Sequence, residues 1–298
     1  MVKTKVFLIG CVKSTEVALK TFIINQNVEV CGILTCRQST FNSDFSDITK
    51  IANIALVPIF YFEEISEKNI IEFIKKAKIQ NVFVVGWSRL LSKNLIKMKN
   101  VNFFGYHPAA LPQNRGRHPI IWALALGLNE TASTFFRLQD TPDSGSVINQ
   151  KKINITNNDY ASDLYNKILN EIPKQINEII QAILIHSIPE KVQDYNKSNY
   201  WRKRKHIDGI IDWRMPAEGI YNLIRALSHP YPGAEFQFCG LKYNVMKSII
   251  IKSNFNHNLE PGKVINIDTS GLLVKCGTNA ILLNQLNKIP NVKIGDYL

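Results

Sequence analysis

The sequence lacks any apolar run long enough to cross a membrane. None of its 298 residues lies in a stretch near the roughly 20 consecutive apolar residues that a membrane helix needs. The opening MVKTKVFLIGCVKS has a short, strand-like apolar run and no small-x-small cleavage site, so it does not resemble a signal peptide. We therefore expect a soluble, cytoplasmic protein with no membrane partner.

Cysteine is sparse and shows no metal-binding pattern. The five cysteines are odd in number and scattered, and no CxxC is present. Cys31 and Cys36 are too far apart in sequence, and too short of nearby histidine, to suggest a zinc site. We expect free thiols in a reducing compartment and no metal.

Acidic residues are too few to balance the basic ones. The sequence has 36 Lys and Arg against 24 Asp and Glu, a formal net charge of +12. This excess favours an anionic partner such as a phosphate, a nucleotide or RNA. A lysine-rich face in contact with solvent alone is the alternative.

Glycine is scarce where a dinucleotide-binding turn would need it. The first turn, residues 10–14, reads GCVKS and offers one glycine, whereas the dinucleotide fingerprint is G-x-G-x-x-G. Strands and helices nevertheless alternate: the patterns predict strands at 3–10, 28–34 and 81–86, and helices from 14 and over 62–78. This order indicates an α/β fold with a doubly wound, mostly parallel, Rossmann-like sheet. Ligands should then lie at the carboxyl ends of its strands, near Gly10, Gly86 and the segment after Phe104.

The composition changes along the chain in a way that indicates two domains. Residues 159–186 predict a long helix that is interrupted or starts afresh at Pro173. A polar, basic stretch without apolar periodicity follows, and then a short helix and several strands separated by turns. We expect a catalytic domain over 1–190, a linker over 191–207 and a smaller, β-rich, OB-like domain over 208–298.

The segments with the most chemical information are GYHPAALPQNRGRHPIIWALALG, residues 105–127, and TFFRLQDTPDSGSVINQ, residues 134–150. His107 follows an apparent strand and enters a proline-flanked loop, and a helix is predicted to begin near Pro119. Asp143 lies in a turn between two apolar stretches. These two residues are therefore candidates for a site built from loops.

The spacing of these residues resembles a known family. The pattern H-P-x-x-L-P-x-x-R-G-x-x-P, followed by D-x-G 36 positions after the histidine, is similar to formyltransferases that use 10-formyltetrahydrofolate. DGIIDW, NLIRAL, PYPGA and PGKVI resemble the second domain of the tRNA-modifying and sugar-modifying members. The resemblance covers most of the chain and is weakest in the linker and at the far C-terminus.

The resemblance implies catalytic roles for His107 and Asp143. Formyl transfer needs an amine to attack a formyl carbon, and an oxyanion develops. A histidine can take the proton of the amine or donate to the oxyanion, and a carboxylate can orient and stabilise the imidazole. The alternatives are an ordinary loop histidine and a turn-forming aspartate.

One position departs from the family pattern. The family typically has Asn two residues before the histidine, where it donates to the oxyanion, and this chain has Gly105. A backbone N–H, a water or Asn102 would have to replace it, although a strand places 102 and 107 on opposite faces. We expect a divergent but active enzyme.

The resemblance also implies binding segments. The pterin of the donor would lie against Gly86, Trp87, Ser88, Leu90, Leu91, Leu138 and Asp140, with Trp87 equally readable as a core aromatic. Arg115, Arg117, His118, Trp201 and Arg202 would contact the acceptor. Arg115 could instead fix the loop, and the WRKRK run at 201–205 could be a solvated linker.

Three functions compete for the chain. The first is formyl transfer to a nucleotide-linked amino sugar, UDP- or dTDP-4-amino-4,6-dideoxyhexose, because the loop most resembles enzymes of pseudaminic-acid-type pathways. Methionyl-tRNA formylation is the alternative, but residues 37–60 lack the basic R-G-K-K insertion of that subfamily and hold only Arg37 and Lys50 as cations. A non-catalytic anion- or nucleotide-binding protein is the third. Nucleic acid is thus not favoured as partner, and family habit suggests a homodimer.

Overall fold

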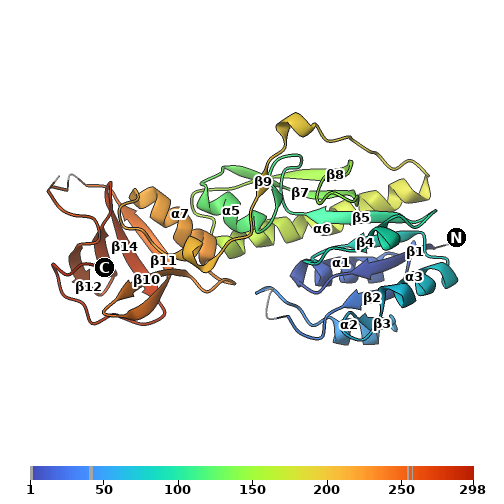
Figure 1. Ribbon diagram of the computed structural model, residues 1–298, viewed down its shortest axis with the longest axis horizontal. Coiled ribbons are helices and arrows are strands. Elements are labelled where there is room, and N and C mark those ends of the chain that lie inside the picture. The colour runs from blue at the N-terminus through green and yellow to red at the C-terminus, as the bar shows by residue number, and fades with distance from the viewer. Residues whose placement is uncertain (1–2, 40–42, 254, 257) are drawn as a thin grey trace. The chain divides into compact units, whose positions relative to one another are not determined.

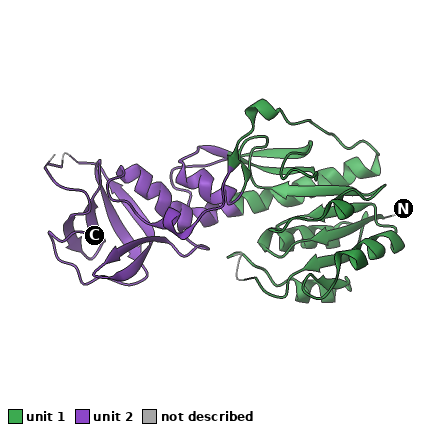
Figure 2. Cartoon of the chain, viewed as in Figure 1, with its two compact units in different colours: residues 1–116, 131–153, 166–200 green, residues 117–130, 154–165, 201–298 purple. Residues whose placement is uncertain are grey.

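The computed structural model describes residues 3–39, 43–253, 255–256 and 258–298. Residues 40–42, which fall in the stretch compared with the R-G-K-K insertion, lie outside this description. The chain forms two compact units: unit 1 holds residues 1–116, 131–153 and 166–200, and unit 2 holds residues 117–130, 154–165 and 201–298 (Figure 2). The predicted domain bounds stay a prediction. No described helix is both long and apolar enough to span a bilayer.

A seven-stranded sheet in the order β3-β2-β1-β4-β5-β7-β8 forms the centre of unit 1 (Figure 1). Its strands are β1 (Thr4–Ile9), β2 (Val28–Thr35), β3 (Ile59–Tyr61), β4 (Asn81–Val84), β5 (Asn102–His107), β7 (Glu130–Arg137) and β8 (Val147–Asn154). The first five strands pair in parallel, whereas β7 runs antiparallel to β5. The prediction of a mostly parallel, Rossmann-like sheet is confirmed.

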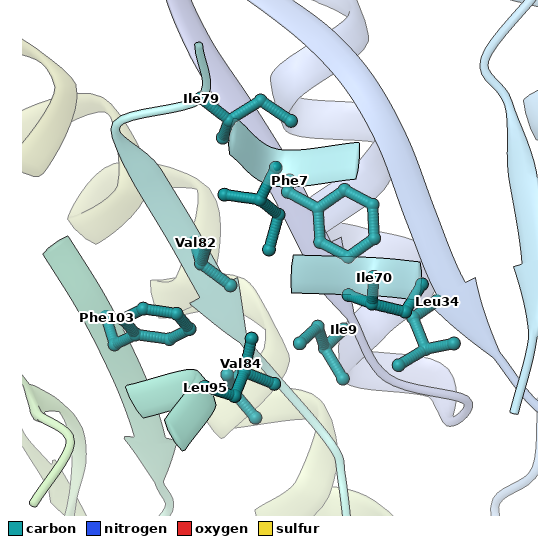
Figure 3. Close-up of a cluster of buried hydrophobic side chains, with 10 residues drawn as sticks. Phe7, Ile9, Leu34, Ile70, Ile79, Val82, Val84, Leu95 and Phe103 are labelled. Atoms are coloured by element: carbon teal, nitrogen blue, oxygen red, sulfur yellow. The ribbon is translucent and has the colours of Figure 1, made fainter. Parts of the chain in front are cut away.

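Helices cover this sheet because its strands are apolar on both faces. They are α1 (Lys13–Ile24), α2 (Thr49–Ile54), α3 (Glu67–Lys76), α4 (Lys93–Ile96) and the longer α6 (Ala161–Leu184). One face packs against α3 and α4 through a cluster of ten buried side chains: Phe7, Ile9, Leu34, Ile70, Ile74, Ile79, Val82, Val84, Leu95 and Phe103 (Figure 3). On the other face Phe22 of α1 meets Phe83 at 4.8 Å between ring centroids. Each such side chain contributes about 1.5–3 kcal/mol on burial.

The expected break at Pro173 is wrong, because α6 runs through this residue without interruption. A proline inside a helix removes one hydrogen bond and costs about 3 kcal/mol. Here a continuous apolar stripe is buried on both sides of the proline: Leu164, Ile168, Ile172, Ile176 and Ile180. Packing at helical spacing outweighs the local cost.

Two short strands and a 3-10 helix involve the proline-flanked loop after β5 and residues 195–201. The short strands β6 (Arg115–Gly116) and β9 (Tyr200–Trp201) pair in a two-stranded sheet, and a 3-10 helix, Tyr195–Lys197, precedes β9. Residues 191–200 therefore pack against the loop. The polar composition of this stretch gives no indication of these contacts in the sequence.

Unit 2 contains a five-stranded antiparallel sheet in the order β10-β11-β14-β13-β12. Its strands are β10 (Ala234–Phe238), β11 (Leu241–Ile251), β12 (Val264–Asp268), β13 (Gly271–Lys275) and β14 (Ala280–Leu286). Helices α5 (Pro119–Ala125) and α7 (Ala217–Leu227) and the 3-10 helix His206–Gly209 complete it. The prediction of a β-rich second domain is confirmed.

Candidate functional site

His107 is the last residue of β5 and has one ring nitrogen already engaged. Its side chain is buried, and Nε2 lies 2.8 Å from the carbonyl oxygen of Asn114. A carbonyl can only accept a hydrogen bond, so Nε2 carries the proton and donates. In the neutral ring Nδ1 is then the basic nitrogen, and it is the one that can take a proton.

Asp143 lies on the side of this basic nitrogen. Its backbone is left-handed, with a φ of 56°, which aspartate tolerates better than most residues. The N–H of Gly116 donates to Oδ2 at 2.8 Å, and Oδ1 lies 3.9 Å from His107 Nδ1. This gap is too long for a direct hydrogen bond but suits a bridging water or substrate nitrogen. The structure therefore brings the two predicted catalytic residues together.

Gly145 makes the turn around Asp143 possible. A Cβ at this position would lie 1.8 Å from the carbonyl oxygen of Arg137, a backbone atom of β7. No side chain fits at that distance, so D-x-G at 143–145 requires its glycine for close approach of the turn to the sheet.

The neighbouring strand fills the space beside Gly105. Gly105 pairs with Phe136 of β7, and a Cβ at 105 would lie 2.7 Å from both Phe136 Cζ and Leu138 Cδ2. The side-chain amide of Asn102 does not serve as a replacement, because its nitrogen donates to Asn81 Oδ1 at 3.0 Å and its oxygen accepts from Arg137 at 2.9 Å. An apolar ring thus stands where the family pattern has an amide.

Gly105→Asn is therefore expected to destabilise the protein rather than accelerate the reaction. Overpacking of this kind costs about 1–3 kcal/mol, which thermal unfolding of the purified variant would detect. Replacing the ring by a smaller side chain with Phe136→Leu should reduce the loss of stability caused by Gly105→Asn, as a double-mutant cycle would show. A variant as stable as the wild type, or faster in turnover, would contradict this account.

The predicted donor-binding segment begins at the carboxyl end of β4. Gly86 has a φ of 71°, and a Cβ there would lie 2.2 Å from Val12 and 2.7 Å from Ser14. Trp87, Leu91 and Leu138 all pack against the core cluster. The buried indole Nε1 of Trp87 has no hydrogen-bond partner among the described residues. A polar edge of a flat, apolar ligand would satisfy it, so this segment fits a pterin.

Two members of this predicted segment point elsewhere. Leu90 is 84% exposed. The side chain of Asp140 pairs with Lys97 at 2.8 Å and with Lys93 at 3.5 Å, and these lysines hold the pKa of the Asp140 carboxyl below its ordinary value. Ser88 follows Trp87 and is half-buried. Trp87, Leu91 and Leu138 thus gather on one cluster, whereas Leu90 faces solvent and Asp140 faces a lysine pair.

Arg115 is wholly buried in unit 1. Its Nε and Nη2 donate to Gln193 Oε1 at 3.1 and 2.7 Å, and Nη1 donates to the hydroxyl of Tyr200 at 3.1 Å. The guanidinium also lies over the ring of Tyr195 at 5.0 Å. These contacts favour the role of fixing the loop over that of binding an acceptor.

In unit 2, cations gather around His118 and Trp122. The guanidinium of Arg202 lies 5.2 Å and that of Arg204 6.0 Å from the centroid of the Trp122 ring. Burial lowers the pKa of His118, and nearby positive charges lower it further: Arg117, Arg204 and Lys203. Flat aromatic and guanidinium groups in one cluster suit an anionic ligand that carries a ring.

The predicted residues Trp201 and Arg202 differ in which of their groups already make hydrogen bonds within the protein. Arg202 donates to both carboxylate oxygens of Asp208, at 2.7 and 2.5 Å, and this pairing lowers the pKa of Asp208. The backbone of Trp201 accepts from the N–H of Arg117 at 3.0 Å. A ligand would therefore have to compete with Asp208 for the guanidinium of Arg202. The guanidinium of Arg204 donates to the backbone carbonyl of Asp208 at 2.8 Å.

Sequence reasoning missed the residues that hold the pair in place. Asn114 and Gly116 act through backbone groups, and Gln193 comes from the expected linker. In the separate cluster of unit 2, Trp122 and Arg204 were read only as parts of longer motifs. The N-R-G run was the one available signal for the first two. Among the described residues, no group of three or more His, Cys, Asp or Glu could hold a metal ion.

Comparisons with known proteins identify the family of this chain. Residues 13–180 match the formyl transferase family, and residues 203–294 match the formyl transferase C-terminal domain. The bifunctional polymyxin resistance protein ArnA of Wigglesworthia glossinidia brevipalpis is 32% identical over 232 residues, which cover 78% of this chain and 35% of that protein. The chain thus spans about a third of the length of this relative.

Two solved structures share the fold. The N-formyltransferase from Helicobacter canadensis, in complex with folinic acid and dTDP-3-aminofucose, has a TM-score of 0.72 at 17% identity, covering 95% of this chain and 99% of its own. WlaRD, a sugar 3N-formyl transferase in the presence of dTDP and 5-N-formyl-THF, has a TM-score of 0.70 at 18% identity, covering 96% and 99%. At these identities the likeness concerns the fold alone. With more than half of its residues in the first match, the chain belongs to the formyl transferase family.

Proposed function

We propose that this enzyme transfers a formyl group from 10-formyltetrahydrofolate to the primary amine of a nucleotide-linked amino sugar, UDP- or dTDP-4-amino-4,6-dideoxyhexose. The observation that carries the proposal is the 3.9 Å gap between His107 Nδ1 and Asp143 Oδ1. An amine placed in this gap would meet a base on one side and a carboxylate on the other. His107 takes its proton, and Asp143 stabilises the imidazolium that results.

The choice of donor rests on the pterin-like segment and on the relatives. Trp87, Leu91 and Leu138 offer an apolar surface and an unsatisfied indole N–H. Two structures of the same fold contain folinic acid or 5-N-formyl-THF. When bound there, the folate would supply the formyl carbon.

The choice of acceptor rests on charge and on the same relatives, one of which binds dTDP-3-aminofucose and the other dTDP. The basic cluster of unit 2 suits a diphosphate with a base ring. By contrast, Arg37, one of two cations where a tRNA enzyme would carry its basic insertion, pairs with Glu64 and lies 3.9 Å over the ring of Tyr61. That guanidinium is engaged within the protein.

One assay with competing acceptors tests the proposal. Purified protein with 10-formyltetrahydrofolate should formylate the UDP- or dTDP-amino sugar and leave methionyl-tRNA unmodified, as mass spectrometry of both products would show. Efficient formylation of the tRNA, which the net charge of +12 would favour, would reverse the ranking. An absence of turnover with either acceptor would support a non-catalytic, anion-binding protein.

A further inference from the structure

Gln193 connects the catalytic turn to the buried arginine of the loop. Its side chain is 4% exposed and lies in unit 1, between the turn at 143–145 and Arg115. Nε2 donates to the carbonyl oxygens of Asp143 and Gly145, at 2.9 and 2.6 Å. Oε1 accepts two hydrogen bonds from Arg115. Every polar group of this amide therefore has a partner.

The partners also fix which way the amide points. One end faces only donors, the guanidinium nitrogens of Arg115, and the other end faces only carbonyl oxygens. A flipped amide would place N–H groups against the guanidinium and an oxygen against the carbonyls. Glutamine is the residue whose side chain matches both ends at this length, and glutamate matches only the end that faces Arg115.

We infer that Gln193 is a positioning residue, which holds the backbone of Asp143 so that its carboxylate faces His107. The inference rests on the proposed function, since it concerns the same pair. The loop contacts the turn at two places: Gly116 N–H binds the Asp143 side chain, and Arg115, through Gln193, binds its backbone. With only the first of these, the left-handed turn could shift relative to β5. A displacement of about 1 Å in a catalytic group can cost about a hundredfold in rate.

Gln193→Glu separates this role from simple pairing with Arg115. The variant keeps the acceptor for the guanidinium and adds a charge that favours it, but it sets an oxygen against two carbonyls. We expect kcat to fall about 10- to 100-fold, with KM for both substrates within about threefold of wild type, because positioning in the transition state is lost and binding is not.

Gln193→Ala is the second variant, for the case that Gln193→Glu does not fold, and the same direction is expected. Asn196→Ala is the matched control, since Asn196 is exposed on the same segment and its recorded hydrogen bond is made by the backbone N–H. Circular dichroism and thermal unfolding verify that each protein is folded.

NMR of the His107 ring makes the test independent of turnover, its resonances being assigned by their loss in His107→Gln. At one fixed pH these resonances should shift in both Gln193 variants, because the carboxylate beside the ring moves, and they should stay unchanged in Asn196→Ala. Unchanged resonances in a folded Gln193 variant would overturn the inference, whether or not the wild type is active. An inactive wild type, with resonances that shift in the variants, would instead count against the proposed function alone.

Discussion

His107→Gln is expected to lower kcat by about a hundredfold or more, the usual scale for loss of a general base. Glutamine can still donate to the Asn114 carbonyl from nearly the position of Nε2, so the loop should keep its anchor. What it cannot do is take a proton at the position of Nδ1. Steady-state kinetics with saturating donor and acceptor, beside His107→Ala, would separate loss of the anchor from loss of the base.

The control for this prediction is a histidine of unit 1 outside the site. His186 is exposed just beyond α6 and has a φ of 53°. Asparagine tolerates this backbone well, so His186→Asn should retain wild-type kcat and stability. Near-normal turnover in His107→Gln would remove the imidazole from the mechanism, because nothing else in that variant could titrate at this position.

Asp143→Asn should produce a loss of similar size, on the order of 10²–10⁴ in kcat, with little change in unfolding temperature. Asparagine keeps the left-handed turn and can still accept from Gly116 N–H through its carbonyl oxygen. Its neutral amide would then stand beside His107 Nδ1 in place of the charged carboxylate oxygen, so the variant lacks the negative charge that stabilises the imidazolium.

The comparison variant for Asp143 is a carboxylate that faces the lysines of α4. Asp140→Asn removes a negative charge from the same turn region but leaves the pair intact. It should therefore turn over at close to the wild-type rate. If Asp140→Asn and Asp143→Asn lose activity equally, the general charge of the region matters and the proposed pairing does not.

Much of this architecture could be predicted because its causes are local. The central strands β1 and β4 contain uninterrupted apolar runs, VFLI and VFV, and these runs are buried on both faces. His107 and Asp143 were found because the motifs that contain them resemble those of a known family, and their residue types suit the chemistry. Their approach confirms that the two segments meet, although the roles of the two residues stay a prediction.

What the sequence could not indicate depends on contacts far apart in the chain. Pro173 predicts a break, and only the buried stripe of α6 shows why the helix continues. Gln193 lies in a polar stretch that reads as a linker, 50 residues after Asp143, whose carbonyl it binds. Leu90 was assigned because its segment resembles the pterin-binding segment of the family, yet its side chain is exposed to solvent. Nothing in local periodicity distinguishes these outcomes.

The loop holds the His107–Asp143 pair through backbone groups, and side-chain mutagenesis therefore detects this support poorly. Asn114 contributes a carbonyl and Gly116 an amide hydrogen, and both groups are present in every alanine variant. A conventional alanine scan would therefore report only the strain of a left-handed backbone at Asn114, with a φ of 63°, and not the carbonyl that sets the protonation pattern of His107. An ester bond in place of the amide at 116, which removes the donor and leaves the side chain unchanged, would expose this support.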